Sequence, residues 1–165
     1  MRVLTLLCLV FFVSFVKAES IKIGYLDTQK VLISLTQYQT EILNISKEFE
    51  PKKQELLDLF EYIELLRGNL NSLEISSTTE AFQIELNKIV DLEASFNRET
   101  EYLQQYIDKK NIDLLKKMEL IINTAINEIA ISEDYDLILY ENIAFVSNEI
   151  DITEKIILNI ESQTL

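Results

Sequence analysis

The side chains that could do chemistry in this 165-residue chain are almost all carboxylates. Asp and Glu supply 28 residues, histidine is absent, and the only cysteine is Cys8. A general acid or base needs a pKa shifted towards neutrality by burial or by charged neighbours. Glu41, Glu48 and Glu55 instead recur every seven residues, which is typical of the outer face of a coiled coil. No Ser-His pair, calcium loop or glycine-rich phosphate loop occurs, so the sequence predicts a protein that is not an enzyme and has no catalytic, cofactor-binding or metal-binding residues.

Positive charge is concentrated late in the second of two long predicted helices. Runs of charge on a helix usually form a solvated face, which is one interpretation of this cluster. The other is a basic collar that contacts acidic segments of a partner chain. The four residues are Lys109, Lys110, Lys116 and Lys117.

Aromatic side chains in the same helices are the second group that could bind a partner. Phe49, Phe82 and Phe96 fall on heptad positions, where packing between helices is the usual role. Four others lie off the strict series and are the better candidates for contact with a partner chain. They are Phe60, Tyr62, Tyr102 and Tyr106.

The elements that position these residues are two long helices. From Gln37 to Arg67 the apolar residues follow two heptad series, which predicts a coiled-coil seam. Pro51 lacks an N–H and should bend this helix near Glu50, and Gly68-Asn69 should end it. The two series are Ile42, Phe49, Leu56 and Ile63, and Ile45, Leu59 and Leu66.

A second helix is expected to begin at the capping box Ser77-Thr78-Thr79-Glu80 and to run to about Ile131. Its apolar positions keep the heptad spacing, although Glu93 and Thr100 weaken the middle. At 1.5 Å per residue the helices are about 45 Å and about 80 Å long, so an antiparallel arm should project from a separate body. The apolar positions are Phe82, Leu86, Ile89, Phe96, Leu103, Ile107, Leu114 and Ile121.

The body is expected to combine the two ends of the chain. Strands are predicted at 21–26, 135–140 and 144–146, because these segments are apolar or alternate with polar residues. Asp27 or Thr28 should cap a short helix through Leu35, and 151–154 should cap a closing helix that faces inward. Its inward residues are Ile156, Ile157 and Ile160. So small a sheet is marginal in water and should complete itself against other copies of the chain.

The first eighteen residues resemble a cleaved secretory signal peptide. Arg2 precedes an apolar run from Val3 to Val16, and small residues follow at the expected cleavage site. About fourteen apolar residues are too few for the ~20 of a membrane-spanning helix, and Cys8 lacks the small residue that precedes a lipidation site. We therefore expect residues 1–18 to be a signal peptide, 19–36 and 132–165 to form the body, and 37–131 to form the arm, with its tip near 68–78.

The mature chain is strongly acidic. Without Arg2 and Lys17 it has 13 basic residues against 28 acidic ones, a net charge of −15. Phosphate backbones and anionic lipid would repel it, so nucleic acid is not expected as a partner.

The two ends of the mature chain resemble the Skp (OmpH-like) periplasmic chaperones. The resemblance rests on residues 22–31, which read Lys-Ile-Gly-Tyr-Leu-Asp-Thr-Gln-Lys-Val, and on residues 135–153, with a helical hairpin of suitable length between them. It implies an α+β fold in which three chains join their strands in a central β-barrel and three arms enclose a cavity. It also implies an ATP-independent holdase for unfolded outer-membrane proteins, acting in the periplasm as a homotrimer without cofactors.

The resemblance places the trimerisation body on seven apolar residues and leaves one feature of the family in question. Typical members are basic and attract acidic clients and lipopolysaccharide, whereas here Arg67 and Lys88 face five glutamates near the tip, so a lipopolysaccharide site is not carried over. A non-catalytic trimeric scaffold that binds one folded envelope partner is the alternative function. The glutamates are Glu61, Glu64, Glu74, Glu80 and Glu85, and the body residues are Ile21, Ile23, Tyr25, Leu137, Leu139, Ile143 and Phe145.

Overall fold

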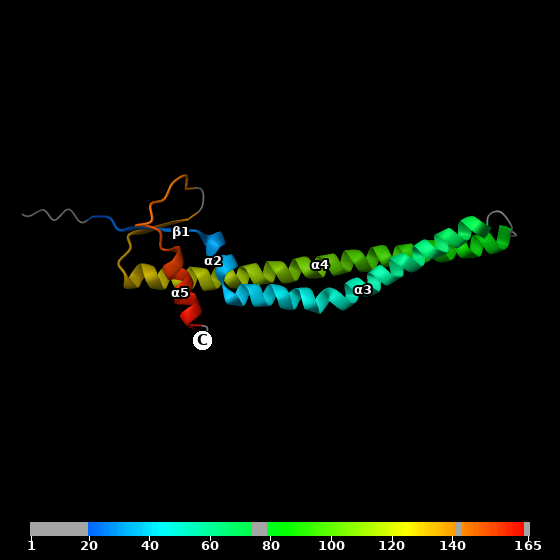
Figure 1. Ribbon diagram of the computed structural model, residues 1–165, viewed down its shortest axis with the longest axis horizontal. Helices are drawn as coiled ribbons and strands as arrows, with labels where there is room; N and C mark the ends of the chain where they lie inside the picture. The colour runs from blue at the N-terminus through cyan, green and yellow to red at the C-terminus, as the bar shows by residue number, and fades with distance from the viewer. Residues whose placement is uncertain (1–19, 74–78, 141–142, 164–165) are drawn as a thin grey trace, which may run out of the picture.

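The computed structural model of the chain, which describes residues 20–73, 79–140 and 143–163, is a long two-helix arm on a small body (Figure 1). The arm consists of α3 (Thr36–Leu73) and α4 (Thr79–Ser132). The body adds β1 (Ile23–Leu26), α2 (Thr28–Ser34), β2 (Leu137–Tyr140) and α5 (Thr153–Gln163) to the near end of the arm. The predicted α+β architecture of a helical hairpin on a small sheet is confirmed. Residues 1–18, with the expected signal peptide and Cys8, lie outside the described residues.

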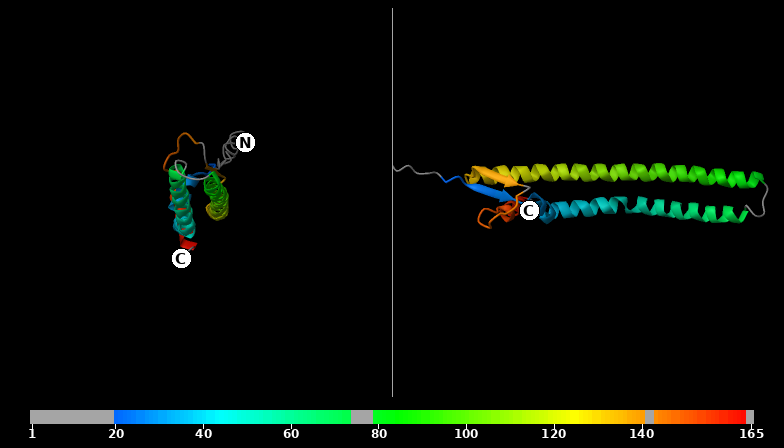
Figure 2. Two further views of the ribbon diagram at one scale, coloured as in Figure 1. Left: turned by 90° about the vertical axis from the view of Figure 1, so that its right-hand side faces the viewer. Right: turned by 90° about the horizontal axis from the view of Figure 1, so that it is seen from above.

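The arm is an antiparallel helix pair whose two helices lie side by side along its length (Figure 2). Of the predicted seam in α3, Phe49, Leu56, Ile63 and Leu66 are buried, and Leu70 extends the first series by one heptad. Ile42, the first position of the series, is exposed. In α4 the predicted positions are buried or half-buried, and the stripe continues towards the body through Met118, Ile122, Ala125 and Ile129.

Gly68 does not end the first helix, because α3 continues through it to Leu73. A glycine inside a helix costs only about 1 kcal/mol, which the packing of Leu66 and Leu70 on either side offsets. Pro51 lies inside α3, and Figure 1 shows the helix bending in its first half, where the ribbon turns from cyan to blue-green. Residues 74–78, with Ser77 and Thr78 of the expected capping box, lie outside the described part of the chain. Within it, Thr79 begins α4 and Glu80 stands in its first turn.

The body begins where α4 ends. Asp134 adopts a left-handed backbone with φ 54°, and the N–H of Tyr135 donates to the carbonyl of Ala130 at 2.9 Å. This is the hydrogen-bond pattern that commonly closes a helix. The chain then turns back as β2, which pairs in parallel with β1 in the register Ile23 to Leu137 and Leu26 to Tyr140.

The expected third strand at 144–146 is wrong, because the described residues from 143 to 150 form bends and turns rather than a strand. The free edge of β1 is taken by the segment that follows. The N–H of Tyr25 donates to Ile150 at 2.7 Å, and the N–H of Ile152 donates to Tyr25 at 2.9 Å. That segment leads directly into α5 and leaves 144–146 no edge of β1 to join.

Three caps connect the helices of the body. The side chain of Asp27 accepts from the N–H of Lys30 at 2.8 Å and caps α2, as predicted. The N–H of Asp27 itself donates to the Thr153 hydroxyl at 3.0 Å, so the starts of α2 and α5 are joined. The Asp151 carboxylate accepts from the N–H of Thr153, and Glu161 accepts from the N–H of Thr36 at the start of α3.

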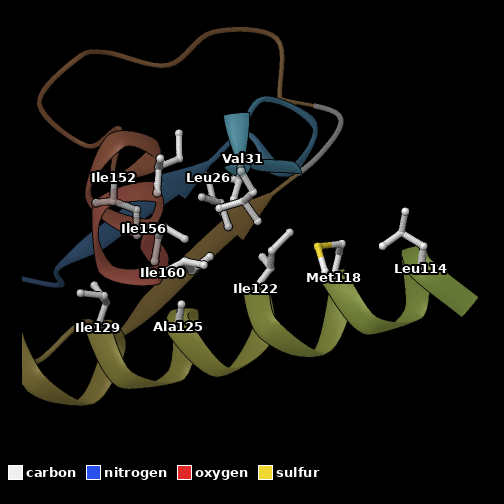
Figure 3. Packing of buried hydrophobic residues seen from close by; sticks show 12 residues of the cluster. Leu26, Val31, Leu114, Met118, Ile122, Ala125, Ile129, Ile152, Ile156 and Ile160 are labelled. Carbon is white, nitrogen blue, oxygen red and sulfur yellow. The ribbon is translucent and has the colours of Figure 1, made fainter. Parts of the chain in front are cut away.

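The main core lies where these elements meet the near end of α4 (Figure 3). Leu26, Val31, Met118 and Ile156 are fully buried there. Ile156, Ile157 and Ile160 face inward from α5, as predicted. Burial of each large side chain is worth about 1.5–3 kcal/mol, so this cluster fixes the body to the arm.

Candidate functional site

The aromatic residues predicted as partner contacts lie on the outside of the arm. Phe60 and Tyr102 are 47% and 69% exposed, and Tyr62 and Tyr106 are also exposed. They are not isolated. The Phe60 ring lies 5.9 Å from that of Phe96, and the Tyr106 ring lies 5.5 Å from that of Phe49, so each of these two exposed rings extends a seam residue towards solvent. Tyr102 stacks on Tyr106 at 6.3 Å.

Tyr62 has a different environment, at the opposite edge of the helix pair from Phe60. Its hydroxyl accepts a hydrogen bond from the Lys88 ammonium at 3.0 Å, and the same ammonium lies 5.4 Å from the ring centroid. The hydrogen bond to Tyr62 is the main reason that the pKa of Lys88 is raised. Because its polar end already has a partner, Tyr62 joins the helices as well as offering a surface.

An apolar groove of about 410 Å³ opens between the helices beside Phe60. Leu57, which the sequence analysis does not single out, lines it and is 54% exposed. The signal for Leu57 was present, because it follows the seam residue Leu56 and so points to the flank of the helix pair. The lining residues are Lys53, Leu56, Leu57, Phe60, Phe96, Thr100 and Leu103.

The four predicted collar lysines divide into two kinds. Lys110 lies 3.2 Å from Glu48 and Lys117 lies 3.1 Å from Glu41, so these two join α4 to α3. The hydrogen bond from Lys110 to Glu48 raises the pKa of that lysine. Lys109 and Lys116 are exposed and have no ion pair within the described residues. Only these two are available to contact a partner without breaking the arm's own pairs.

Ion pairs also join α3 to α4 further along the arm, towards its tip. Arg67 lies 2.6 Å from Glu93 and 3.0 Å from Glu64, and the hydrogen bond to Glu93 is the main cause of its raised pKa. Lys52 joins Glu99 in the same way. Glu93, which weakens the apolar seam in the sequence, therefore contributes an ion pair between the helices.

The sheet of the body has one covered and one open face. Gly24, Leu26 and Ile138 face the core, and a Cβ on Gly24 would lie 3.1 Å from both Ile152 and the Tyr135 ring. The residues predicted for trimerisation lie on the open face of the sheet or outside its two strands. Leu137, Leu139 and Ile143 are exposed, Ile21 and Phe145 are 71% and 84% exposed, and Ile23 and Tyr25 are half-buried.

A second cleft, of about 430 Å³, lies where α2 meets α4 beside the end of β2. Thr28, Gln29, Glu119 and Asn123 line it together with apolar residues and Tyr140. Across residues 20–73, 79–140 and 143–163, no group of three or more acidic, Cys or His side chains is arranged to hold a metal ion. None of the helices in this part of the chain is long and apolar enough to cross a membrane.

Comparison with known proteins identifies this arrangement of arm and body. The family described as outer membrane protein (OmpH-like) matches residues 22–160, which span the arm and nearly all of the body. The chain belongs to the OmpH-like family. The predicted family resemblance is therefore confirmed, and the match includes both sequence segments on which it rested.

One curated protein and one solved structure are similar to the chain. The chaperone protein Skp of Vibrio cholerae is 26% identical over 141 residues, which cover 82% of this chain and 81% of that protein. The crystal structure of a protein described as an OmpH-like outer membrane chaperone, from Caulobacter crescentus, superposes with a TM-score of 0.75 at 11% identity and covers 87% of this chain and 86% of that one. At that identity the structural match shows the shared fold alone.

Proposed function

We propose that this OmpH-like protein is an ATP-independent holdase of the periplasm, which holds unfolded outer-membrane proteins between its arms and prevents their aggregation. The observation that carries the proposal is the placement of large apolar side chains on the outside of the arm. Leu57, Phe60 and Tyr102 are exposed along a projecting helix pair, where they can reach an extended chain. Contiguous apolar surface usually marks a binding site, and Leu57 and Phe60 line one groove.

The body supports the proposal that the working unit is a homotrimer. In the described residues the sheet has two strands, and β2 has a neighbour on one side only. Ile23 and Tyr25 pair in register with Leu137 and Leu139, so these four form one apolar face that the chain itself leaves largely open. A two-stranded sheet is marginal alone, and a cyclic trimer would supply the missing strands and cover. In this proposal residues 1–18 are the cleaved leader, 19–36 and 132–165 the trimerisation body, and 37–131 the arm.

Suppression of aggregation is the experiment that tests the function. Several unrelated outer-membrane proteins would be diluted from denaturant with stoichiometric amounts of the purified protein and without ATP, and light scattering would be followed. A holdase should suppress scattering for all of them. A trimeric scaffold that binds one folded partner would leave scattering unchanged, and that result would contradict the proposal.

Sedimentation equilibrium tests the trimer separately. We expect a stable species of three chains, and we expect Leu139→Asp to shift it towards monomer, because a carboxylate would be buried without a partner. A wild-type protein that sediments as a folded monomer would contradict the shared body. Leu158→Asp is the matched control, since Leu158 is an exposed leucine on α5 rather than on the sheet.

A further inference from the structure

The groove beside Phe60 is the clearest opening into the apolar interior of the arm. It is lined by side chains of both helices, and its volume of about 410 Å³ falls in the range of about 300–1,000 Å³ that is typical of ligand sites. Leu57 and Phe60 remain about half exposed at its lip. An apolar side chain inserted here would remove these atoms from water and would be favoured in proportion to the area covered.

Carboxylates outnumber cations in the stretches of the two helices that supply the lining, because residues 50–64 and 93–103 hold eight acidic residues against three basic ones. Lys53, on the lining, lies 3.9 Å from Glu50, and Arg67 is held by Glu64 and Glu93. Residues four apart share a helix face, which places Glu61 beside Leu57 and Glu64 beside Phe60. Among the described residues Glu61 has no hydrogen bond or ion pair. The groove therefore combines an apolar lining, in which Lys53 is the one charged residue, with net negative charge in the helix stretches around it.

We propose that this groove binds an extended segment of an unfolded chain in which a large apolar side chain lies next to lysine or arginine. The inference rests on the proposed holdase function and specifies which client segments the arm selects. The apolar side chain enters between Leu57 and Phe60, while its cationic neighbour reaches Glu61. Charge complementarity excludes the other occupants, because a second copy of this acidic arm or an anionic lipid surface would be repelled.

Binding of labelled, unstructured peptides to the purified protein tests the proposal by fluorescence anisotropy at low salt. Three peptides are compared: one with leucine and phenylalanine flanked by lysines, one with the same apolar residues flanked by glutamates, and one with the lysines but with serine in place of the apolar residues. The first should bind at least about tenfold more tightly than either of the others, because it alone has both an apolar side chain for the groove and a cation for Glu61.

The double variant Leu57→Gln/Phe60→Gln, in which both exposed side chains become polar, tests whether the peptide binds in this groove. Binding of the first peptide should weaken by at least about tenfold. Leu43→Gln is the matched control, because Leu43 lies two heptads before Leu57 on the same helix face, is similarly exposed, and does not line the groove. It should bind as wild type does, and circular dichroism should show the same helix content in all three proteins.

Two results would overturn the proposal: unchanged binding by the double variant, or equal binding of the lysine-flanked and glutamate-flanked peptides. Failure of the holdase function is a separate result, since it would show as wild-type protein that suppresses no client aggregation. If wild type suppresses aggregation while the double variant binds the first peptide normally, the groove is wrong and the holdase proposal stands.

Discussion

The body and the distal arm bury their apolar residues in different ways. In the body, α2, α5 and the strands close over the near end of α4, and Leu26 and Met118 have no exposed surface. In the distal arm a smaller buried cluster of Ile63, Leu66, Leu70 and Ile89 comes from two helices alone. A helix pair can bury only one stripe on each helix, so its other faces stay in water. The body thus has a closed apolar core, whereas the arm leaves the outer faces of its two helices exposed to solvent.

Ion pairs connect the two helices of the arm outside its apolar seam. Arg67 with Glu93, and Lys110 with Glu48, connect the helices at the edges of the seam. Exposed pairs of this kind contribute little stability individually and weaken in salt. They nevertheless favour the observed register of the two helices, because a shift of one turn would separate opposite charges.

The largest expected contrast comes from truncating one buried residue in each region. Met118→Ala should destabilise the whole protein by about 2–5 kcal/mol, since the body has no room to collapse around the cavity. Ile89→Ala should cost less and should raise hydrogen exchange mainly in the distal arm, where the two helices can move together. Urea denaturation and hydrogen exchange measure both variants, and equal global losses would remove the distinction.

The two glycines give the next contrast, because they should respond to alanine with opposite signs. A Cβ on Gly24 would press on Ile152 and Tyr135, so Gly24→Ala should cost about 1–3 kcal/mol. At Gly68 the new Cβ would meet nothing within 4 Å, so Gly68→Ala should stabilise the arm by about 0.5–1 kcal/mol. Thermal unfolding of both proteins checks the signs, and a destabilised Gly68→Ala protein would mean that α3 is not continuous there.

A smaller effect is expected from the collar lysines, compared as two double variants. Lys110→Gln/Lys117→Gln should increase hydrogen exchange in the near half of the arm, and salt should reduce the difference from wild type. Lys109→Gln/Lys116→Gln should leave exchange unchanged, because neither lysine has an ion pair in the described part of the chain. The second variant also tests the basic collar, since unchanged suppression of client aggregation would leave these lysines as a solvated face.

The smallest effect is expected from acid acting on the body. A hydrogen bond from Lys155 at 2.6 Å lowers the pKa of Glu133 below its ordinary value of 4.5. The folded carboxylate therefore adds stability at neutral pH, and that stability is lost as the pH falls through the folded pKa. Glu133→Gln should be less stable than wild type at pH 7, and the two should converge in acid. A difference that is constant with pH in urea titrations would contradict this.

The local features of the fold were predictable, and the features that depend on distant partners were not. Phe49, Leu56 and Ile63 are buried as the heptad predicts, because helix periodicity is a property of neighbouring residues. The expected strand at 144–146 is wrong because Ile150 and Ile152 already occupy the edge of β1. The stop predicted at Gly68 is wrong because glycine's tendency to end helices was weighted above the heptad, which Leu70 continues seven residues after Ile63.

The candidate site was partly predictable for the same reason. Phe60 is predictable as an exposed aromatic residue because it lies off the heptad seam. Its groove needs Phe96 and Leu103 from the other helix, and the division of the lysines into paired and unpaired depends on register. Register between two helices is set by the whole arm and by the body that anchors it, which no single segment reveals.

The parallel pairing of β1 with β2 also determines the order in which the protein can fold. Lys22 donates its N–H to Asp136, which lies 114 residues further along the chain, so β1 must wait for the whole arm before it gains a neighbour. Local helix contacts form quickly, whereas contacts of such sequence separation are slow. A chain that is made from its N-terminus onwards should therefore pair the two helices of its arm before it completes its body. Until α5 has formed, the apolar side chains of β1 have no complete core to pack against and stay exposed to water.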